Sequence, residues 1–76
     1  MAMIHDKSRT TYFTALEAIK MAGRRVLLNS GATLIVESIV RVGESQYMVE
    51  VRNGDRKHLV SKSCRNGLYV DRVVES

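Results

Sequence analysis

The first third of the chain carries apolar residues at every third or fourth position, a spacing that predicts an amphipathic helix over residues 8–23. The predicted apolar stripe consists of Tyr12, Ala15, Leu16, Ile19 and Ala22, and Phe13 and Met21 flank it. Ser8, Thr10 or Thr11 is expected to cap the helix at its N-terminus, and Gly23 to end it. Because the polar side is not strongly basic, we expect the stripe to cover a face or an open end of a sheet rather than a membrane.

From residue 24 onwards the spacing of apolar residues changes to two, which is typical of β-strands. Strands are predicted over residues 24–28, 33–42, 46–52, 56–64 and 68–74. In the longest of them, one side of the strand holds Leu34, Val36, Val40 and Val42, and the other holds Ile35 and Ile39. Because both sides are apolar at different points, we expect this strand to bend strongly and to bury different faces along its length.

Two Asn-Gly pairs, Asn53-Gly54 and Asn66-Gly67, predict tight hairpin turns, because both turn positions favour a positive φ. They place the segment 56–64 between two hairpin partners. No proline or repeat interrupts the pattern, so all 76 residues are expected to form one domain. The sequence predicts a mainly β fold, in which an N-terminal α-helix precedes a five-stranded, strongly bent antiparallel sheet over residues 24–76, a small barrel of the SH3-like class.

Size and composition indicate how such a domain is stabilised. A chain of 76 residues has a small core, and a half-open barrel leaves its edge strands unpaired, so a homo-oligomer is expected. Residues 1–7 are expected to be disordered or to derive from the expression vector, and the doubled start Met1-Ala2-Met3 is interpreted as a scar in front of a native Met3. No apolar run is long enough to cross a membrane and no secretory signal is present, so a cytoplasmic location is expected.

The net charge of +4 is concentrated in one stretch of the chain. Residues 52–65 contain one acidic residue, Asp55, and five basic ones, which are Arg52, Arg56, Lys57, Lys62 and Arg65. The seven remaining basic residues are balanced by seven acidic ones. Such a cluster is typical of a surface that binds phosphates. The other interpretation is a charged strand that protects a sheet from aggregation.

No catalytic or metal-binding motif is present in the sequence. Cys64 is the only cysteine, so an internal disulfide or a structural zinc site is not expected. We expect Cys64 to be a small, partly buried hydrophobic side chain. A metal-free ribonuclease that uses Arg56, Lys57, His58 and Tyr69 is one alternative, and Cys64 as a nucleophile is another. We expect no enzymatic activity, no cofactor, no metal and no small-molecule substrate.

Several short segments carry a family resemblance. They are YFTALEAI (residues 12–19), NSG (29–31), VES (36–38), QYMVEVRN (46–53) and KHLVS (57–61). Together they resemble the bacterial Sm-like proteins of the Hfq type. The resemblance implies a helix on a five-stranded bent sheet, a ring of subunits closed by edge-strand pairing, and a Tyr-Lys-His motif that lines a pocket for U-rich RNA.

The match to that motif is partial. Lys57 and His58 occupy its last two positions, but Arg56 stands in place of the tyrosine, and residues 63–67 insert an extra hairpin before the final strand. If this chain is aligned with the family without a gap from residue 46 onwards, Lys62 takes the position of the motif's histidine. The resemblance therefore supports the ring geometry better than the uridine pocket.

Two functional hypotheses follow. The first is a non-enzymatic, oligomeric Sm-like module that binds single-stranded RNA through Arg52, Arg56, Lys57, His58, Lys62 and Arg65. The second is a small protein-interaction module, phage- or plasmid-encoded, that binds a host protein through the same basic strand. Direct, length-dependent binding of oligonucleotides is expected only from the first.

Overall fold

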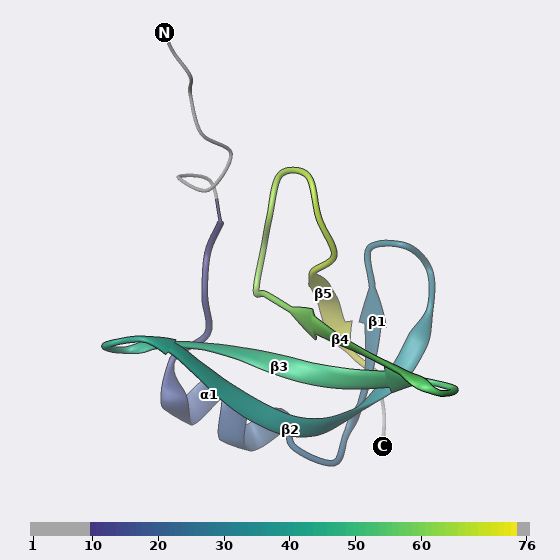
Figure 1. Cartoon of the computed structure of the whole chain (residues 1–76), viewed down its shortest axis with the longest axis horizontal. Coiled ribbons are helices and arrows are strands. Elements are labelled where there is room, and N and C mark those ends of the chain that lie inside the picture. Colours follow the sequence, from purple (N-terminus) through teal and green to yellow (C-terminus); the bar gives the residue numbers. More distant parts are fainter. Residues whose placement is uncertain (1–9, 75–76) are drawn as a thin grey trace, which may run out of the picture.

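The computed structural model describes residues 10–74, so Ser8 and the prediction for residues 1–7 lie outside the described residues. The elements in chain order are α1 (Ala15–Met21), β1 (Arg25–Leu28), β2 (Thr33–Gly43), β3 (Gln46–Asn53), β4 (Arg56–Val60) and β5 (Val70–Val73) (Figure 1). All five strands form one open antiparallel sheet in the order β4-β3-β2-β1-β5. The prediction of a mainly β fold with one helix and a five-stranded antiparallel sheet is confirmed.

Strand β2 links two parts of the sheet and bends between them. Its first residues pair with β1 and its later residues with β3, and the register shifts between Val36 and Ser38, with Glu37 as the extra residue. Before this bulge Val36 is buried and Ile35 is exposed, whereas after it Ile39 packs against the core. A β-bulge increases the bend of a strand and changes which side chains face inward. The predicted change of the buried face along this strand is therefore confirmed.

The helix begins at Ala15, later than predicted. Thr14 is its N-cap, and a capping box joins Thr14 to Glu17: the N–H of Glu17 donates to Thr14 Oγ1 (3.2 Å) and the N–H of Thr14 donates to Glu17 Oε1 (2.9 Å). This reciprocal pair satisfies two N–H groups that a helix start leaves without partners. The prediction that Ser8, Thr10 or Thr11 caps the helix is wrong.

The residues before the helix form backbone hydrogen bonds with β3 and with the segment that follows β4. The N–H of Thr11 donates to the carbonyl oxygen of Ser63 (2.8 Å), and Phe13 and Tyr47 exchange two backbone hydrogen bonds of 2.9 Å each. Phe13 is thereby held beside β3 with its ring in the core. These contacts set the direction in which α1 leaves the sheet.

The face that α1 turns to the sheet differs from the predicted stripe. Ala18 and Met21 are buried, together with Phe13 just before the helix. Leu16 and Ile19, the two large aliphatic residues of the predicted stripe, are 64% and 61% exposed. The prediction failed because a spacing of three or four residues fits both sides of this helix, and the anchoring of Phe13 decides which side is buried.

The first Asn-Gly pair lies at a hairpin turn, shifted by one residue. Asn53 still pairs with Arg56, so the turn residues are Gly54 and Asp55, and Gly54 has a φ of 67°. Glycine adopts this left-handed conformation without steric cost. The β3–β4 hairpin is thus confirmed.

The second Asn-Gly pair does not form a hairpin with β4. The side chain of Asn29 donates to the carbonyl oxygen of Gly67 (3.0 Å) and accepts from the N–H of Tyr69 (2.8 Å), so this part of the chain lies along the β1–β2 turn. β5 then pairs with β1, and Ser61 and Tyr69 form a parallel bridge. The prediction that the basic strand lies between two hairpin partners is wrong, because β4 ends at Val60 and pairs with β3 alone among the described strands.

One core cluster joins the helix to the sheet. It consists of Phe13, Ala18, Met21, Val26, Leu28, Val36, Val49, Val51, Val60 and Val70. The hydroxyl of Ser61, the one buried polar residue of the described part, donates to the carbonyl oxygen of Ser63 (3.3 Å). Every strand contributes at least one side chain to this cluster, which holds both parts of the bent sheet together.

Candidate nucleic-acid interface

Two of the predicted basic residues share one face of the sheet. Arg52 on β3 lies directly opposite Lys57 on β4, and directly opposed residues point the same way. Each has a carboxylate beside it: Arg52 Nε lies 2.8 Å from Glu37 Oε2, and Lys57 Nζ lies 4.0 Å from Glu50 Oε1. Like charges in this arrangement repel each other, and the two glutamates relieve that repulsion.

His58 points to the opposite face of β4. It pairs with Val51, which is fully buried, so the partly buried imidazole faces the side of the sheet that carries the core. Successive residues of a strand alternate between faces, so Lys57 and His58 do not act on the same ligand surface of one chain. Arg56 is exposed next to the hairpin turn.

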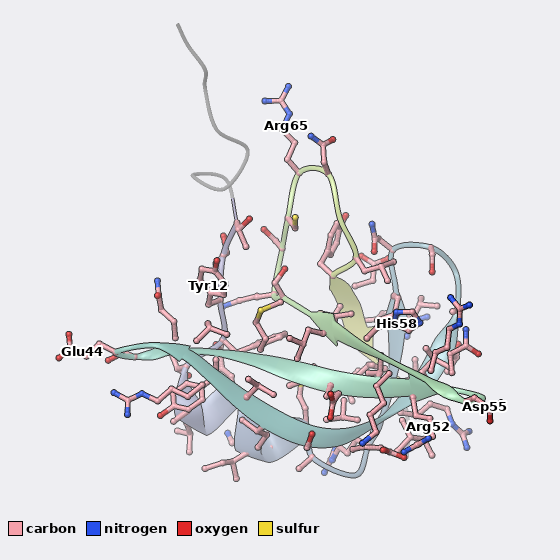
Figure 2. All side chains as sticks on the ribbon, viewed as in Figure 1. Tyr12, Glu44, Arg52, Asp55, His58 and Arg65 are labelled. Atoms are coloured by element: carbon pink, nitrogen blue, oxygen red, sulfur yellow. The ribbon has the colours of Figure 1, made fainter. Side chains whose placement is uncertain are left out.

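Lys62 and Arg65 lie away from the hairpin. Lys62 Nζ contacts Glu17 Oε2 of the helix at 2.9 Å. The N–H of Thr14, and then Lys62, lower the pKa of Glu17, because both favour its ionised form. Arg65 stands at the tip of the loop between β4 and β5, far from Arg52 at the hairpin (Figure 2). The six predicted residues therefore do not form one continuous patch.

A shallow groove of about 470 Å³ lies at the bend of the sheet. Its lining consists of Arg25, Thr33, Leu34, Ile35, Glu37, Arg52 and Gly54. Ile35, 46% exposed, gives it an apolar wall between two guanidinium groups. This volume lies within the range of sites for small organic ligands, and an apolar surface between cations suits a sugar or base with an attached phosphate.

Strand pairing extends the basic surface beyond the groove. Arg25 pairs with Ile35, and Arg72 pairs with Leu27, so both arginines lie on the outer face of the β5-β1-β2 part of the sheet. Neither forms an ion pair with another residue of the described range 10–74. The sequence interpretation missed both. Both lie outside the basic stretch of residues 52–65, and Arg72 reaches the same face as Arg25 only because β5 pairs with β1.

The spatial distribution of charge differs from its distribution along the chain. Three cations of the basic stretch each lie beside a glutamate from another element: Glu37 on β2, Glu50 on β3 and Glu17 on α1. Residues without such a partner in the described part include Arg25, Arg56 and Arg72. The positive potential that a phosphate meets is therefore expected to be greater near β1 and β5 than a count along the sequence indicates.

The groups proposed for catalysis are not gathered in one place. Tyr69 forms its bridge with Ser61, beyond the end of β4 that lies furthest from Arg56. Cys64 is half-buried and accepts a long hydrogen bond from Thr10 Oγ1 (3.7 Å). Within residues 10–74, no three His, Cys, Asp or Glu side chains come together in a group fit for a metal ion.

Comparison of the chain with protein-family models gives no match, and comparisons with curated proteins and with solved structures give none either. α1, the helix of the described residues, is too short to span a membrane. The functional interpretation therefore rests on the fold and on the groove.

Proposed function

We propose that the chain is a non-enzymatic, Sm-like small-barrel module that forms a homo-oligomer and binds single-stranded RNA. The observation that carries this proposal is the open strand order β4-β3-β2-β1-β5, in which the sharply bent β2 joins two parts of one sheet and the helix precedes the first strand. This arrangement agrees with what the resemblance to the bacterial Sm-like family implies. The single cysteine agrees with action in a reducing cytoplasm.

Assembly would use the two edge strands. β4 bonds to β3 on one side and β5 bonds to β1. Within residues 10–74 the outer sides of these two strands meet at one end, where the N–H of Val70 donates to the carbonyl oxygen of Ser61 (3.0 Å), and the rest of each edge has no strand partner. β4 has five residues and β5 has four, so an antiparallel pair between two copies would leave few backbone groups unpaired. Repeating this pair around an axis closes a ring and protects both edges.

RNA would bind across the groove and the neighbouring outer face. Arg25 and Arg72 would contact phosphates, and Ile35 would pack against a sugar or base. Arg52 is already paired with Glu37, so a phosphate must compete with that carboxylate. This arrangement replaces the basic strand of the sequence hypothesis with a site that combines β1, β2, β3 and β5.

The second hypothesis, a module that binds a host protein, is favoured by one observation. The outer face of the β3–β4 hairpin alternates cations and carboxylates, as in the pairs Arg52–Glu37 and Lys57–Glu50. A surface of mixed charge suits the polar rim of a protein interface better than it suits a phosphate backbone. RNA binding by the purified protein distinguishes the two hypotheses.

The test is a fluorescence anisotropy titration with U-rich RNA oligonucleotides of increasing length, at several salt concentrations. Affinity should increase with length until the oligonucleotide covers the groove, and three phosphate contacts should give a log-log salt slope of about −2. Native mass spectrometry of the RNA-free protein should show a closed ring. A monomer that binds no RNA even at low salt would refute this proposal and favour the protein partner.

A further inference from the structure

Helix α1 is apolar on nearly all sides. Its seven residues, with the C-cap Ala22, include only two polar ones, Glu17 and Lys20. A helix with this composition is normally buried on more than one side, because apolar surface in contact with water is unfavourable. The sheet covers only one side of α1.

The exposed side of α1 points directly away from the core. Successive residues of a helix are rotated by about 100°, so Leu16 and Ile19 lie opposite Ala18 and Met21. Leu16 and Ile19 are the most exposed large hydrophobic residues of the described part, at 64% and 61%, and the small, exposed Ala15 lies beside them. Figure 1 shows α1 at the lower left, with β2 and β3 on one side of it and no described element on the other.

The two polar residues lie together on one flank of this exposed face. Glu17 and Lys20 are three positions apart, so they are neighbours on the helix surface. If two copies of α1 pack antiparallel through this exposed face, with the two-fold axis at the level of Ala18 along the helix, the flank of one helix faces the same flank of the other. Glu17 of each copy then lies beside Lys20 of its partner, so the face is complementary to itself in both shape and charge.

We propose that the exposed face of α1, formed by Leu16 and Ile19, binds the same face of a second copy of this chain in an antiparallel, two-fold contact. The apolar residues supply the affinity. Glu17 and Lys20 supply the orientation, because a parallel pairing does not bring them together in this way. Glu17 Oε1 accepts from the N–H of Thr14 and Glu17 Oε2 contacts Lys62, so the partner's Lys20 would add a third contact. An ionised carboxylate has about four acceptor sites, so it can accept this contact as well.

This contact differs from ring closure because it leaves the edges of β4 and β5 free. The surface of a seven-residue helix is smaller than the roughly 800 Å² per partner of a standard interface, so the pairing of two single copies is weak. Several helices on one face of a ring would pair simultaneously with those of a second ring, and multivalency would then strengthen the contact. The expected assembly is twice the mass of the unit that edge pairing produces.

The test is sedimentation equilibrium of the full chain without RNA, from low to high micromolar concentration. At high concentration the wild type should approach twice the mass that it has at low concentration. This holds whether the species at low concentration is a monomer or a ring. Ile19→Glu should lower the association constant of this doubling by at least about tenfold, since each contact would bury two added charges, one from each copy. Ile35→Glu is the matched control, because Ile35 is 46% exposed on the outer sheet face, and it should double like the wild type.

Lys20→Glu tests the orientation, because it places two glutamates together across the two-fold axis. Lys20→Glu should lower the association constant of the doubling by about threefold relative to the wild type, and added salt should reduce this difference between the two proteins. Equal masses for the wild type and Ile19→Glu at every concentration would overturn the proposal. A lower melting temperature of dilute Ile19→Glu with unchanged doubling would also overturn it, because the face would then be covered within its own chain.

Discussion

The β3–β4 hairpin and the β1–β5 pair both carry arginine on their outer face, but within residues 10–74 only the hairpin has carboxylates in ion-pairing contact with its cations. Arg52 and Lys57 lie 2.8 Å and 4.0 Å from glutamate oxygens, whereas Arg25 and Arg72 have no carboxylate partner among the described residues. The pairing of strands brings Glu37 and Glu50 to the hairpin. The positive potential of a small sheet therefore depends on strand register as much as on the number of cations.

The largest expected effect comes from removing Arg25 and Arg72, the two outer-face cations for which the described part of the chain provides no carboxylate partner. Arg25→Gln combined with Arg72→Gln should weaken RNA binding by more than about tenfold and reduce the log-log salt slope by about 1.4, since two phosphate contacts are lost. Anisotropy titrations at several salt concentrations measure both quantities.

The matched variant removes the same charge from the hairpin. Arg52→Gln combined with Lys57→Gln should weaken RNA binding by no more than about threefold, because Glu37 and Glu50 already neutralise these side chains. Equal losses in the two double variants would show that the difference between the two surfaces does not affect binding.

An intermediate effect is expected from releasing one hairpin cation. Glu37→Gln removes the carboxylate that holds Arg52 Nε at 2.8 Å, so the guanidinium becomes available in the groove. RNA affinity should increase by about threefold, while the free energy of unfolding changes by no more than about 0.5 kcal/mol, as for other exposed pairs. Glu44→Gln, at the β2–β3 turn, removes the same charge outside the groove lining and should leave affinity nearer to that of the wild type.

The smallest effect concerns stability and involves the third paired cation, Lys62. The N–H of Thr14 and then Lys62 lower the pKa of Glu17 in the folded protein. The stabilisation is therefore present above the ordinary pKa of glutamate and is lost as the pH falls through the lowered value. Urea unfolding of the wild type and Glu17→Gln should show the wild type more stable at neutral pH, with the difference disappearing in acid. A difference that is independent of pH would contradict this.

Local patterns in the sequence were enough to predict five antiparallel strands and the change of the buried face along β2. The apolar residues change sides between Val36 and Ile39, which predicts a strand that buries two faces. The bulge at Glu37 produces this change of face. The β3–β4 hairpin was also predictable, because Gly54 accepts the positive φ that a tight turn needs. These features depend on residues that are close together in the chain.

The features that could not be predicted depend on contacts between distant residues. The orientation of α1 follows from the bonds between Phe13 and Tyr47, and the course of the loop before β5 follows from the side chain of Asn29. Neither contact has a local signal. The groove was missed for the same reason, because Arg25 and Arg52 meet only after β1, β2 and β3 have paired.

The β1–β5 pairing also affects the order of events during synthesis. β1 to β4 follow one another as neighbouring antiparallel strands, so each can pair soon after it leaves the ribosome, whereas β5 must pair with β1, the strand that was made first. Long-range pairings of this kind form slowly. Arg72 is carried by this late strand. A nascent chain in which only β1 to β4 have paired therefore presents an incomplete cationic face, and the proposed RNA site is complete only when β5 pairs with β1.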